Sequence, residues 1–386
     1  MNIAVLYRTH PIRRDSIPSV PRFLAFLIRQ LKAANPDFMF YVGCPDGGDV
    51  QDVKFTSIGK SYLVSKRYLL RRKLFMMLGL HPPPGKVNTF KVRRFFSSVP
   101  QLDVVICTKT TDIALARKYS PGCKVIWWHL GIDKFNRRAF KKAVNASSLI
   151  AYTGAVTYKY VYDRLMPEPF PTPVLIAHGP YDISRMETSF RDLRSDQIRS
   201  RHGIAADEIV ILHVGGARPE KGYEVATASL KMIEFHNSPV VRFVSIGHGE
   251  NSVTYLSENL IIDKREILTL EEVFSFYKIA DIGLVIPLWK EPGPAVFVEM
   301  LFFETAVIAS YEAGVPEMMS KNPECALPVY QPNSILSWSQ SISQLIENEG
   351  LRESLSEKGR RHAIDFFKEP VIENWSKAIN SLKNTG

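Results

Sequence analysis

Short runs of apolar residues alternate with longer stretches of helical periodicity along this chain. The apolar runs of the first half are NIAVLY, FMFYVG, DVVIC, KVIWW and LIAYT, and those of the second half are EIVILHVGG, VVRFVSIG, EIL, DIGLVIPL and AVIAS. Runs that are apolar throughout are typical of parallel strands buried on both faces. Because strands and helices alternate, the pattern predicts an α/β fold with doubly wound parallel sheets.

The alternation is interrupted once, by the proline-rich stretch PEPFPTPVLIAHGPYDI, and then starts again. Two such series predict two Rossmann-like domains facing a cleft, and a chain of 386 residues fits two cores better than one. We expect an N-terminal domain over 1–177, a C-terminal domain over 178–365, and a final helix over 366–386 that crosses back to the first domain. Ligands of such folds bind beyond the carboxyl ends of the strands, so the loops that follow the strands should carry the site.

The charge of the chain is concentrated in one place. Residues 53–102 contain 11 Lys and Arg residues and no acid, whereas the rest of the chain has 38 basic and 39 acidic residues, and the total is +10. This basic insertion interleaves cations with bulky apolar side chains, which favours contact with an anionic membrane surface. A solvated insertion and an anionic acceptor are alternatives. Nucleic acid is a weaker one, since no recognition module accompanies the charge.

The cysteines and the N-terminus bear on the compartment. Cys44, Cys107, Cys123 and Cys325 are scattered and lack metal-ligand spacing, which indicates buried thiols in a reducing compartment. The N-terminus lacks the features of a secretory signal, and no apolar run approaches the ~20 residues of a membrane helix. We therefore expect a cytoplasmic protein, with peripheral attachment to the cytosolic membrane face as an extension. No Asp-x-Asp stretch or His cluster occurs, so we expect neither a metal nor a required cofactor.

Two loops of the second half combine glycines with charged residues. In HVGGARPEKGYE, Gly215 and Gly216 follow a predicted strand, and Arg218 and Lys221 precede a helix. A glycine turn at a helix N-terminus presents N–H groups, and two cations beside it suit a diphosphate. An ordinary turn with exposed charges is the alternative. The loop SIGHGE, with Gly247, is a weaker signal of the same kind.

A third loop, WKEPGPAVFVEM, carries two carboxylates. Glu291 lies in the loop with Gly293, and Glu299 lies about one turn into a helix that should begin near Pro294. An ionised carboxylate only accepts hydrogen bonds, so it can hold two neighbouring hydroxyls of a ribose or hexose. Solvent exposure is the alternative for Glu299, although its apolar neighbours should bury the helix, and a buried carboxylate needs partners.

The stretch ADIGLVIPLWKEPGPAVFVEMLFFETAVIASYEAGVPEMM resembles the donor-site block of the GT-B fold, family-four retaining glycosyltransferases, also called group 1 glycosyltransferases. The shared features are the pair Ala280 and Asp281, Pro287, two glutamates with seven residues between them, Gly314, and the pair Pro316 and Glu317. GGARPEKG resembles the basic loop of that family, SIGHGE its glycine turn, and VLIAHGPYDI its segment entering the donor domain. The resemblance is clearest over 178–365. In the first half only the opening strand–loop–helix and WWHLGID are similar.

The resemblance implies an enzyme that moves a sugar from a nucleoside-diphosphate sugar, such as a UDP- or GDP-sugar, to an acceptor with retention of configuration. It implies that Glu299 binds the ribose hydroxyls and Glu291 the hydroxyls of the transferred sugar. It also implies that Arg218 and Lys221 stabilise the departing diphosphate, where one preorganised donor is worth ~2.7–4 kcal/mol.

The resemblance assigns further contacts as well. The amides around Gly293, Pro294 and Ala295 would point at the sugar or the phosphate. His129 would reach the sugar from the first domain, and a satisfied histidine at a strand end is the alternative.

The chain also departs from that family. Arg218 and Lys221 lie closer together than is usual, and Pro294 replaces a glycine, which removes one backbone donor. The N-terminal loop RTHPIRRDSIPS lacks paired glycines, and Arg13 and Arg14 in it are candidates for a phosphate contact.

Together, the donor loops and the basic insertion predict a hexosyltransferase-like enzyme acting on a lipid-linked or otherwise anionic glycan precursor at a membrane surface, as in polysaccharide biosynthesis. Two alternatives remain open. One is a nucleotide-sugar epimerase or hydrolase of the same fold, and the other is a non-catalytic protein that binds a nucleotide-sugar or a polyanion. The sequence specifies neither the base, the sugar nor the acceptor.

Overall fold

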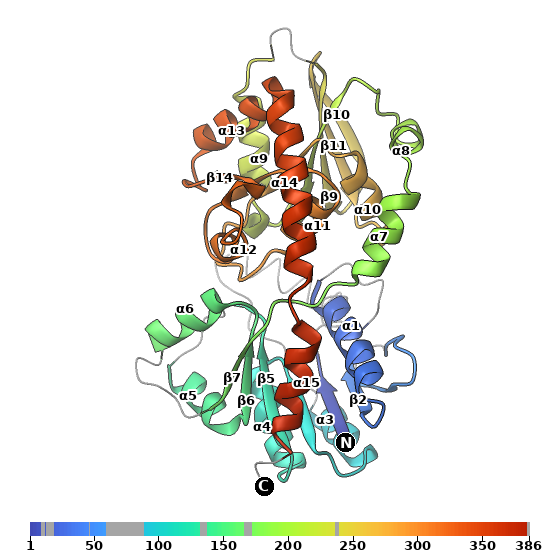
Figure 1. Cartoon of the computed structure of the whole chain (residues 1–386), viewed down its shortest axis with the longest axis vertical. Helices are drawn as coiled ribbons and strands as arrows, with labels where there is room; N and C mark the ends of the chain where they lie inside the picture. Colours follow the sequence, from blue (N-terminus) through green and yellow to red (C-terminus); the bar gives the residue numbers. More distant parts are fainter. Residues whose placement is uncertain are drawn as a thin grey trace. The chain divides into compact units, whose positions relative to one another are not determined.

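The computed structural model describes residues 1–8, 12, 19–45, 47–58, 89–131, 137–165, 172–235 and 239–383. The chain divides into two compact units, Met1–Pro180 with Pro370–Gly386, and Tyr181–Glu369 (Figure 1). Arg13, Arg14 and residues 59–88 of the basic insertion lie outside the described residues. Among the described helices, none is both long and apolar enough to cross a bilayer. The four cysteines are buried, and none of them forms a disulfide.

Unit 1 contains a seven-stranded sheet in the order β3-β2-β1-β4-β5-β6-β7, in which every neighbouring pair is parallel. Its strands are β1 (Asn2–Leu6), β2 (Met39–Cys44), β3 (Lys54–Ser57), β4 (Val104–Cys107), β5 (Lys124–His129), β6 (Leu149–Tyr152) and β7 (Val174–Ile176). All residues of β4 and β6 are buried. The continuous apolar runs of the sequence therefore mark strands that are covered on both faces.

Helices cover both faces of this sheet. The apolar residues of α3 (Thr89–Ser98), α4 (Thr110–Tyr119), α5 (Arg137–Ala146) and α6 (Ala155–Leu165) form one core with strand residues that include Trp127. Successive strand residues point to opposite faces, and the next residue, Trp128, contacts Trp375 at 5.0 Å between ring centroids. Trp375 belongs to α15 (Val371–Ser381), which packs beside α1 (Ser19–Ala34) (Figure 1). The last helix of the chain thus completes the core of the first unit.

Unit 2 contains a second seven-stranded sheet, in the order β10-β11-β9-β8-β12-β13-β14. Its strands are β8 (Ile209–Val214), β9 (Val241–His248), β10 (Ser252–Ser257), β11 (Leu260–Glu266), β12 (Ile282–Val285), β13 (Ala306–Ser310) and β14 (Leu327–Val329). Its helices are α7 (Ile183–Asp192), α8 (Ser195–Arg201), α9 (Tyr223–Lys231), α10 (Leu270–Ile279), α11 (Ala295–Phe302), α12 (Val315–Met318), α13 (Ile335–Glu347) and α14 (Glu349–Phe367). All strand pairs are parallel except β10 with β11.

The hairpin of β10 and β11 corrects the sequence analysis, which placed strands at VVRFVSIG and at EIL and none between them. The strand is Leu260–Glu266 instead, and β10 pairs antiparallel with it. All six residues of β10 are exposed, so this strand lacks the apolar run by which buried strands are recognised. The strand β11 was missed because charged residues interrupt its apolar run.

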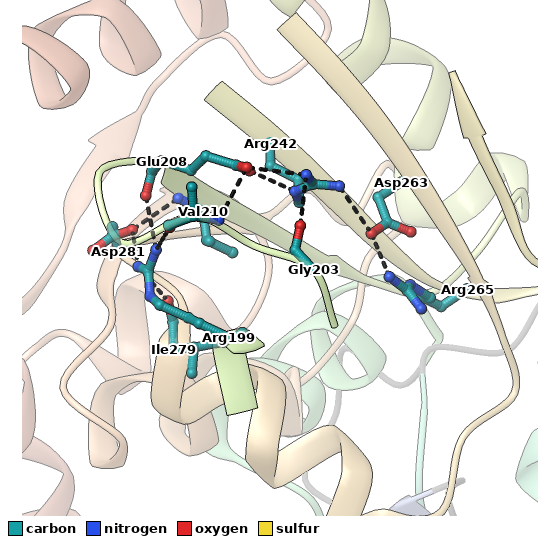
Figure 2. A network of polar contacts seen from close by, with 10 residues as sticks. Arg199, Gly203, Glu208, Val210, Arg242, Asp263, Arg265, Ile279 and Asp281 are labelled. Atoms are coloured by element: carbon teal, nitrogen blue, oxygen red, sulfur yellow. Dashed lines mark hydrogen bonds and ion pairs between the residues drawn. The ribbon is translucent and has the colours of Figure 1, made fainter. Parts of the chain in front are cut away.

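Two charged residues of β11, Asp263 and Arg265, belong to a buried ionic network (Figure 2). Arg242 on β9 binds both carboxylate oxygens of Glu208, at 2.5 and 3.1 Å. The guanidinium of Arg242 also lies 3.6 Å from Asp263 Oδ2, to which Arg265 donates at 2.6 Å. Arg242, Glu208 and Asp263 are 5%, 9% and 0% exposed. A buried charge is tolerated only with partners, so each member depends on the others.

A second part of this network fastens the amino ends of two strands. Asp281, just before β12, accepts a hydrogen bond from the Val210 amide at 2.7 Å and from Arg199 at 3.0 Å. Arg199 also donates to the carbonyl of Glu208 at 2.9 Å. Asp281 and Arg199 thus stabilise the edge of the sheet at which β8 and β12 begin. The glycine loops lie at the opposite edge, where these strands end.

Replacing Arg242 by Leu should therefore destabilise the protein. The substitution leaves Glu208 buried without its bidentate partner, which lowers the free energy of unfolding by ~3–5 kcal/mol. Arg361→Leu is the matched control, because it removes an exposed i,i+4 pair with Glu357 and should cost no more than ~0.5 kcal/mol. Urea denaturation measures both variants. Equal midpoints would contradict the structural role of the network.

Candidate functional site

The first two glycine loops of unit 2 meet at the carboxyl ends of β8 and β9. The amides of Gly215 and Gly216 both donate to the carbonyl of Ile246, at 3.0 and 2.8 Å. Gly216 has a φ of +61°, and a Cβ atom there would lie 2.0 Å from the carbonyl oxygen of Gly247. Only glycine fits this approach. These two amides, which the sequence pattern offered to a phosphate, are engaged in joining the loops.

The third loop is tied to its neighbours in the same way. The amide of Leu288 donates to the carbonyl of Glu220 at 3.0 Å, and the amide of Gly314 donates to the carbonyl of Glu291 at 3.0 Å. A Cβ atom at Gly314 would lie 1.8 Å from the carbonyl oxygen of Pro292. The loops after β8, β12 and β13 are therefore held together through their backbones.

An ion pair closes this arrangement. Lys221 Nζ lies 2.8 and 2.7 Å from the two carboxylate oxygens of Glu291, and the side chains are 19% and 16% exposed. The ring of Trp289, which is 39% exposed, has its centroid 6.0 Å from the same Nζ atom. An ammonium group has three donors, so Lys221 retains one beyond this bidentate contact. The structure thus brings together two residues that the sequence predicted to share a site.

Arg218 stands apart from this ion pair. Its Nε atom donates to the carbonyl of Gly215 at 3.1 Å, and the residue is exposed. It forms no ion pair with a carboxylate in the described part of the chain. Arg218 immediately precedes the short 3₁₀ turn Pro219–Lys221, and Lys221 ends it. The guanidinium of Arg218 is therefore exposed to solvent, whereas the ammonium of Lys221 is paired with Glu291.

Glu299 lies on α11, which begins at Ala295 after Pro294 as the sequence predicted. Glu299 is 3% exposed, and its Oε2 atom accepts a hydrogen bond from the hydroxyl of Tyr277 at 3.0 Å. Sequence reasoning missed Tyr277 because this residue lies on α10, with no motif around it. The amides of Gly293 and Ala295 donate to no acceptor among the described residues. They remain available at the start of α11, where a helix favours negative charge.

A chain of polar side chains lies beneath the first two loops. His213 contacts the carbonyl of Lys221 through Nε2 at 2.8 Å and the hydroxyl of Ser245 through Nδ1 at 3.0 Å. His248 Nε2 contacts the same hydroxyl at 2.9 Å. A carbonyl only accepts, so we assign the proton of His213 to Nε2, and the hydroxyl of Ser245 then donates to Nδ1. This network of side chains fixes the backbone of Lys221.

His213 is neutral in this setting, because burial lowers its pKa from 6.5 to about 4. Sequence reasoning missed this residue too. The only signal was a histidine inside the apolar run EIVILHVGG, where a small polar network is needed to satisfy both ring nitrogens.

The carboxyl edge of the sheet in unit 1 carries further ionisable groups. His129 ends β5, is 2% exposed, and has its pKa lowered to about 4 by burial. Arg8, just after β1, forms an ion pair with Asp112 at the start of α4. Burial raises the pKa of Asp112 to about 6. His129 belongs to a different unit from the three glycine loops, while Arg8 and Asp112 were not anticipated from the sequence.

Comparisons with known proteins show which family model and which folds the chain resembles. Residues 194–362 match the family model of the group 1 glycosyl transferases. A glycosyltransferase of Methanocaldococcus jannaschii is 27% identical over 180 residues, which make up 45% of this chain and 48% of that protein. The chain spans about half the length of the curated relatives it matches.

Two solved structures share the fold over the whole chain. Sucrose-phosphate synthase from Thermosynechococcus elongatus has a TM-score of 0.77 at 13% identity, with both chains fully covered. HepE of Anabaena in complex with UDP-glucose has a TM-score of 0.69 at 12% identity, again with full coverage. The predicted fold class is confirmed: both units are α/β, with an all-parallel first sheet and a mostly parallel second one, as in GT-B glycosyltransferases. The predicted resemblance to group 1 glycosyltransferases is confirmed by the family match.

The neutral state of His213 makes stability depend on pH. Between pH about 6.5 and about 4 the unfolded chain protonates this histidine while the folded chain does not, so the free energy of unfolding falls as the pH falls. His213→Gln keeps a donor for the Lys221 carbonyl and cannot titrate. Chemical denaturation at pH 7 and pH 4.5 should show an acid loss that is smaller in the variant by roughly 2–3 kcal/mol. Parallel pH profiles of the two proteins would refute the assignment.

Proposed function

We propose that this protein is a glycosyltransferase that takes a sugar from a nucleoside-diphosphate sugar, with the donor bound at the carboxyl edge of the sheet in unit 2. The observation that carries the proposal is the ion pair of Lys221 and Glu291 at the junction of three backbone-tied loops. This segment falls within the match to the group 1 family. HepE, which shares the fold, was solved with UDP-glucose, which makes a UDP-sugar the first donor to test.

In this proposal Lys221 and Arg218 stabilise the departing diphosphate. Negative charge grows on the leaving phosphate as the bond to the sugar breaks, and cations already in place need no reorganisation at that moment. The side chain of Lys221 is held by Glu291, and its backbone carbonyl is held by His213. Lys221 is therefore the preorganised cation of the two. Arg218 is exposed and supplies charge with less positional control. The amides of Gly293 and Ala295 add donors for the same phosphate or the sugar.

In this proposal the two glutamates bind hydroxyl groups of different sugars of the donor. Glu291 accepts from the transferred sugar while it orients Lys221. Glu299 accepts from the ribose, and the hydrogen bond from Tyr277 fixes the rotation of its carboxylate. Retention of configuration rests on the resemblance to the family. Independence from metal ions rests on the lack of an Asp-x-Asp stretch or His cluster in the sequence. Both form part of the proposal.

Unit 1 supplies the acceptor side. His129 carries a pKa of about 4, so it is neutral at physiological pH and acts as a hydrogen-bonding group rather than a cation. The acceptor that we propose is a lipid-linked or otherwise anionic glycan precursor at the cytosolic face of a membrane, because the basic insertion interleaves cations with apolar residues. An epimerase or hydrolase would form its product without an acceptor, and product analysis separates it from a transferase.

Lys221→Met tests the role of the preorganised cation. The variant should lose about 10²–10³-fold in kcat for sugar transfer from a UDP- or GDP-sugar, since one positioned donor to a developing charge is removed. Lys231→Met, on the exposed surface of α9, is the matched control and should keep full activity. Initial rates at varied concentrations of the donor give kcat and KM. Unchanged kcat in Lys221→Met would remove this residue from the mechanism.

A further inference from the structure

One face of unit 1 is strongly positive over two of its helices. The helices α3 to α6 lie side by side on one face of the sheet, with α3 against α4 and α4 against α5. The exposed residues of α3 and α5 include seven cations: Lys91, Arg93, Arg94, Arg137, Arg138, Lys141 and Lys142. All seven are exposed, and neither helix contains an acidic residue. The four cations of α5 lie outside the segment to which the sequence analysis assigned the excess charge.

The positions of these cations oppose the stability of the helices. All seven lie within the first six residues of α3 or α5, and neither helix has a basic residue in its last turn. A helix carries partial positive charge at its N-terminus, so cations are favoured at the other end. Charge that stability does not favour indicates a role in binding an anion.

A groove on α5 gathers three of the charges. It has a volume of about 460 Å³ and is lined by Arg138, Lys141, Lys142, Asn145 and Ala146. The three cations form no ion pair with a carboxylate in the part of the chain that the structure describes. The cations around the groove are therefore free to bind an external anion, and the amide of Asn145 adds a hydrogen-bonding group.

An exposed aromatic side chain accompanies the charges on α3. Phe90 is 72% exposed and lies next to Lys91 in the first turn of the helix. Cations beside an exposed apolar group are the combination that binds the boundary between headgroups and acyl chains. Residues 59–88, which precede α3 directly, continue the same mixture of cations and bulky apolar residues in the sequence.

We propose that the first halves of α3 and α5 form a docking surface for anionic lipid headgroups, with Phe90 at the headgroup boundary. This surface deepens the proposed function, since it would hold unit 1 against the membrane that carries the acceptor. Its binding does not require transfer, so it can fail independently of the donor site. Nucleic acid is the competing polyanion, and a composition that pairs cations with an exposed apolar side chain favours the lipid.

The test measures the binding of the full-length protein to vesicles. Co-sedimentation compares phosphatidylcholine vesicles with vesicles that also contain phosphatidylserine, at low and high salt. The triple variant Arg138→Gln, Lys141→Gln and Lys142→Gln should bind the anionic vesicles about 100-fold more weakly, because each cation near an anionic leaflet contributes about fivefold. The matched control neutralises three exposed cations of unit 2, Arg201→Gln, Lys231→Gln and Arg361→Gln, and should bind as the wild type does.

A stabilisation by uridine diphosphate that both triple variants share with the wild type would establish that they are folded and that the donor site is intact. Equal losses in the two triple variants would overturn the proposal, because net charge alone would then explain the binding. Failure of the wild type to sediment with anionic vesicles at low salt would overturn it as well. So would displacement of the protein from vesicles by equimolar single-stranded polynucleotide.

Discussion

The ion pair between Lys221 and Glu291 is the interaction on which the candidate site depends. It joins residues 70 positions apart, from the loops after β8 and β12. Both partners are also fixed through their own backbones, since the carbonyl of Lys221 contacts His213 and the carbonyl of Glu291 accepts from the amide of Gly314. Because of these contacts, the ammonium group of Lys221 has little freedom to change its position when a ligand binds. The site is therefore preorganised for charge that develops at one place, which is the requirement for stabilising a leaving group.

The sequence predicted those features that local chemistry determines. The continuous apolar runs specified parallel strands, and Pro294 specified where α11 begins. The same reasoning missed β10, because a fully exposed edge strand has no apolar signature. It also missed Tyr277 and His213, whose contacts with Glu299 and Lys221 exist only after distant segments have packed. The glycine loops were recognised, but the engagement of the Gly215 and Gly216 amides depends on a carbonyl from another strand.

The two units use charge in opposite ways. In unit 2 the buried Arg242 and the partly buried Arg265 are matched by carboxylates (Figure 2). In unit 1 the cations of α3 and α5 face outward without acids on the same helices. The net charge of a sequence segment does not distinguish cations that are paired inside the protein from cations that are exposed on its surface. Acids elsewhere offset the four cations of α5 in the total, although they lie on other elements.

The most direct test of the central claim is a crystal structure of the protein with a bound UDP-sugar. We expect the diphosphate within about 3 Å of Lys221 Nζ and the ribose hydroxyls at the carboxylate of Glu299. We also expect the loops after β8, β9 and β12 to keep the backbone contacts described above. A nucleotide bound elsewhere, with the ion pair of Lys221 and Glu291 untouched by the ligand, would contradict the proposed donor site.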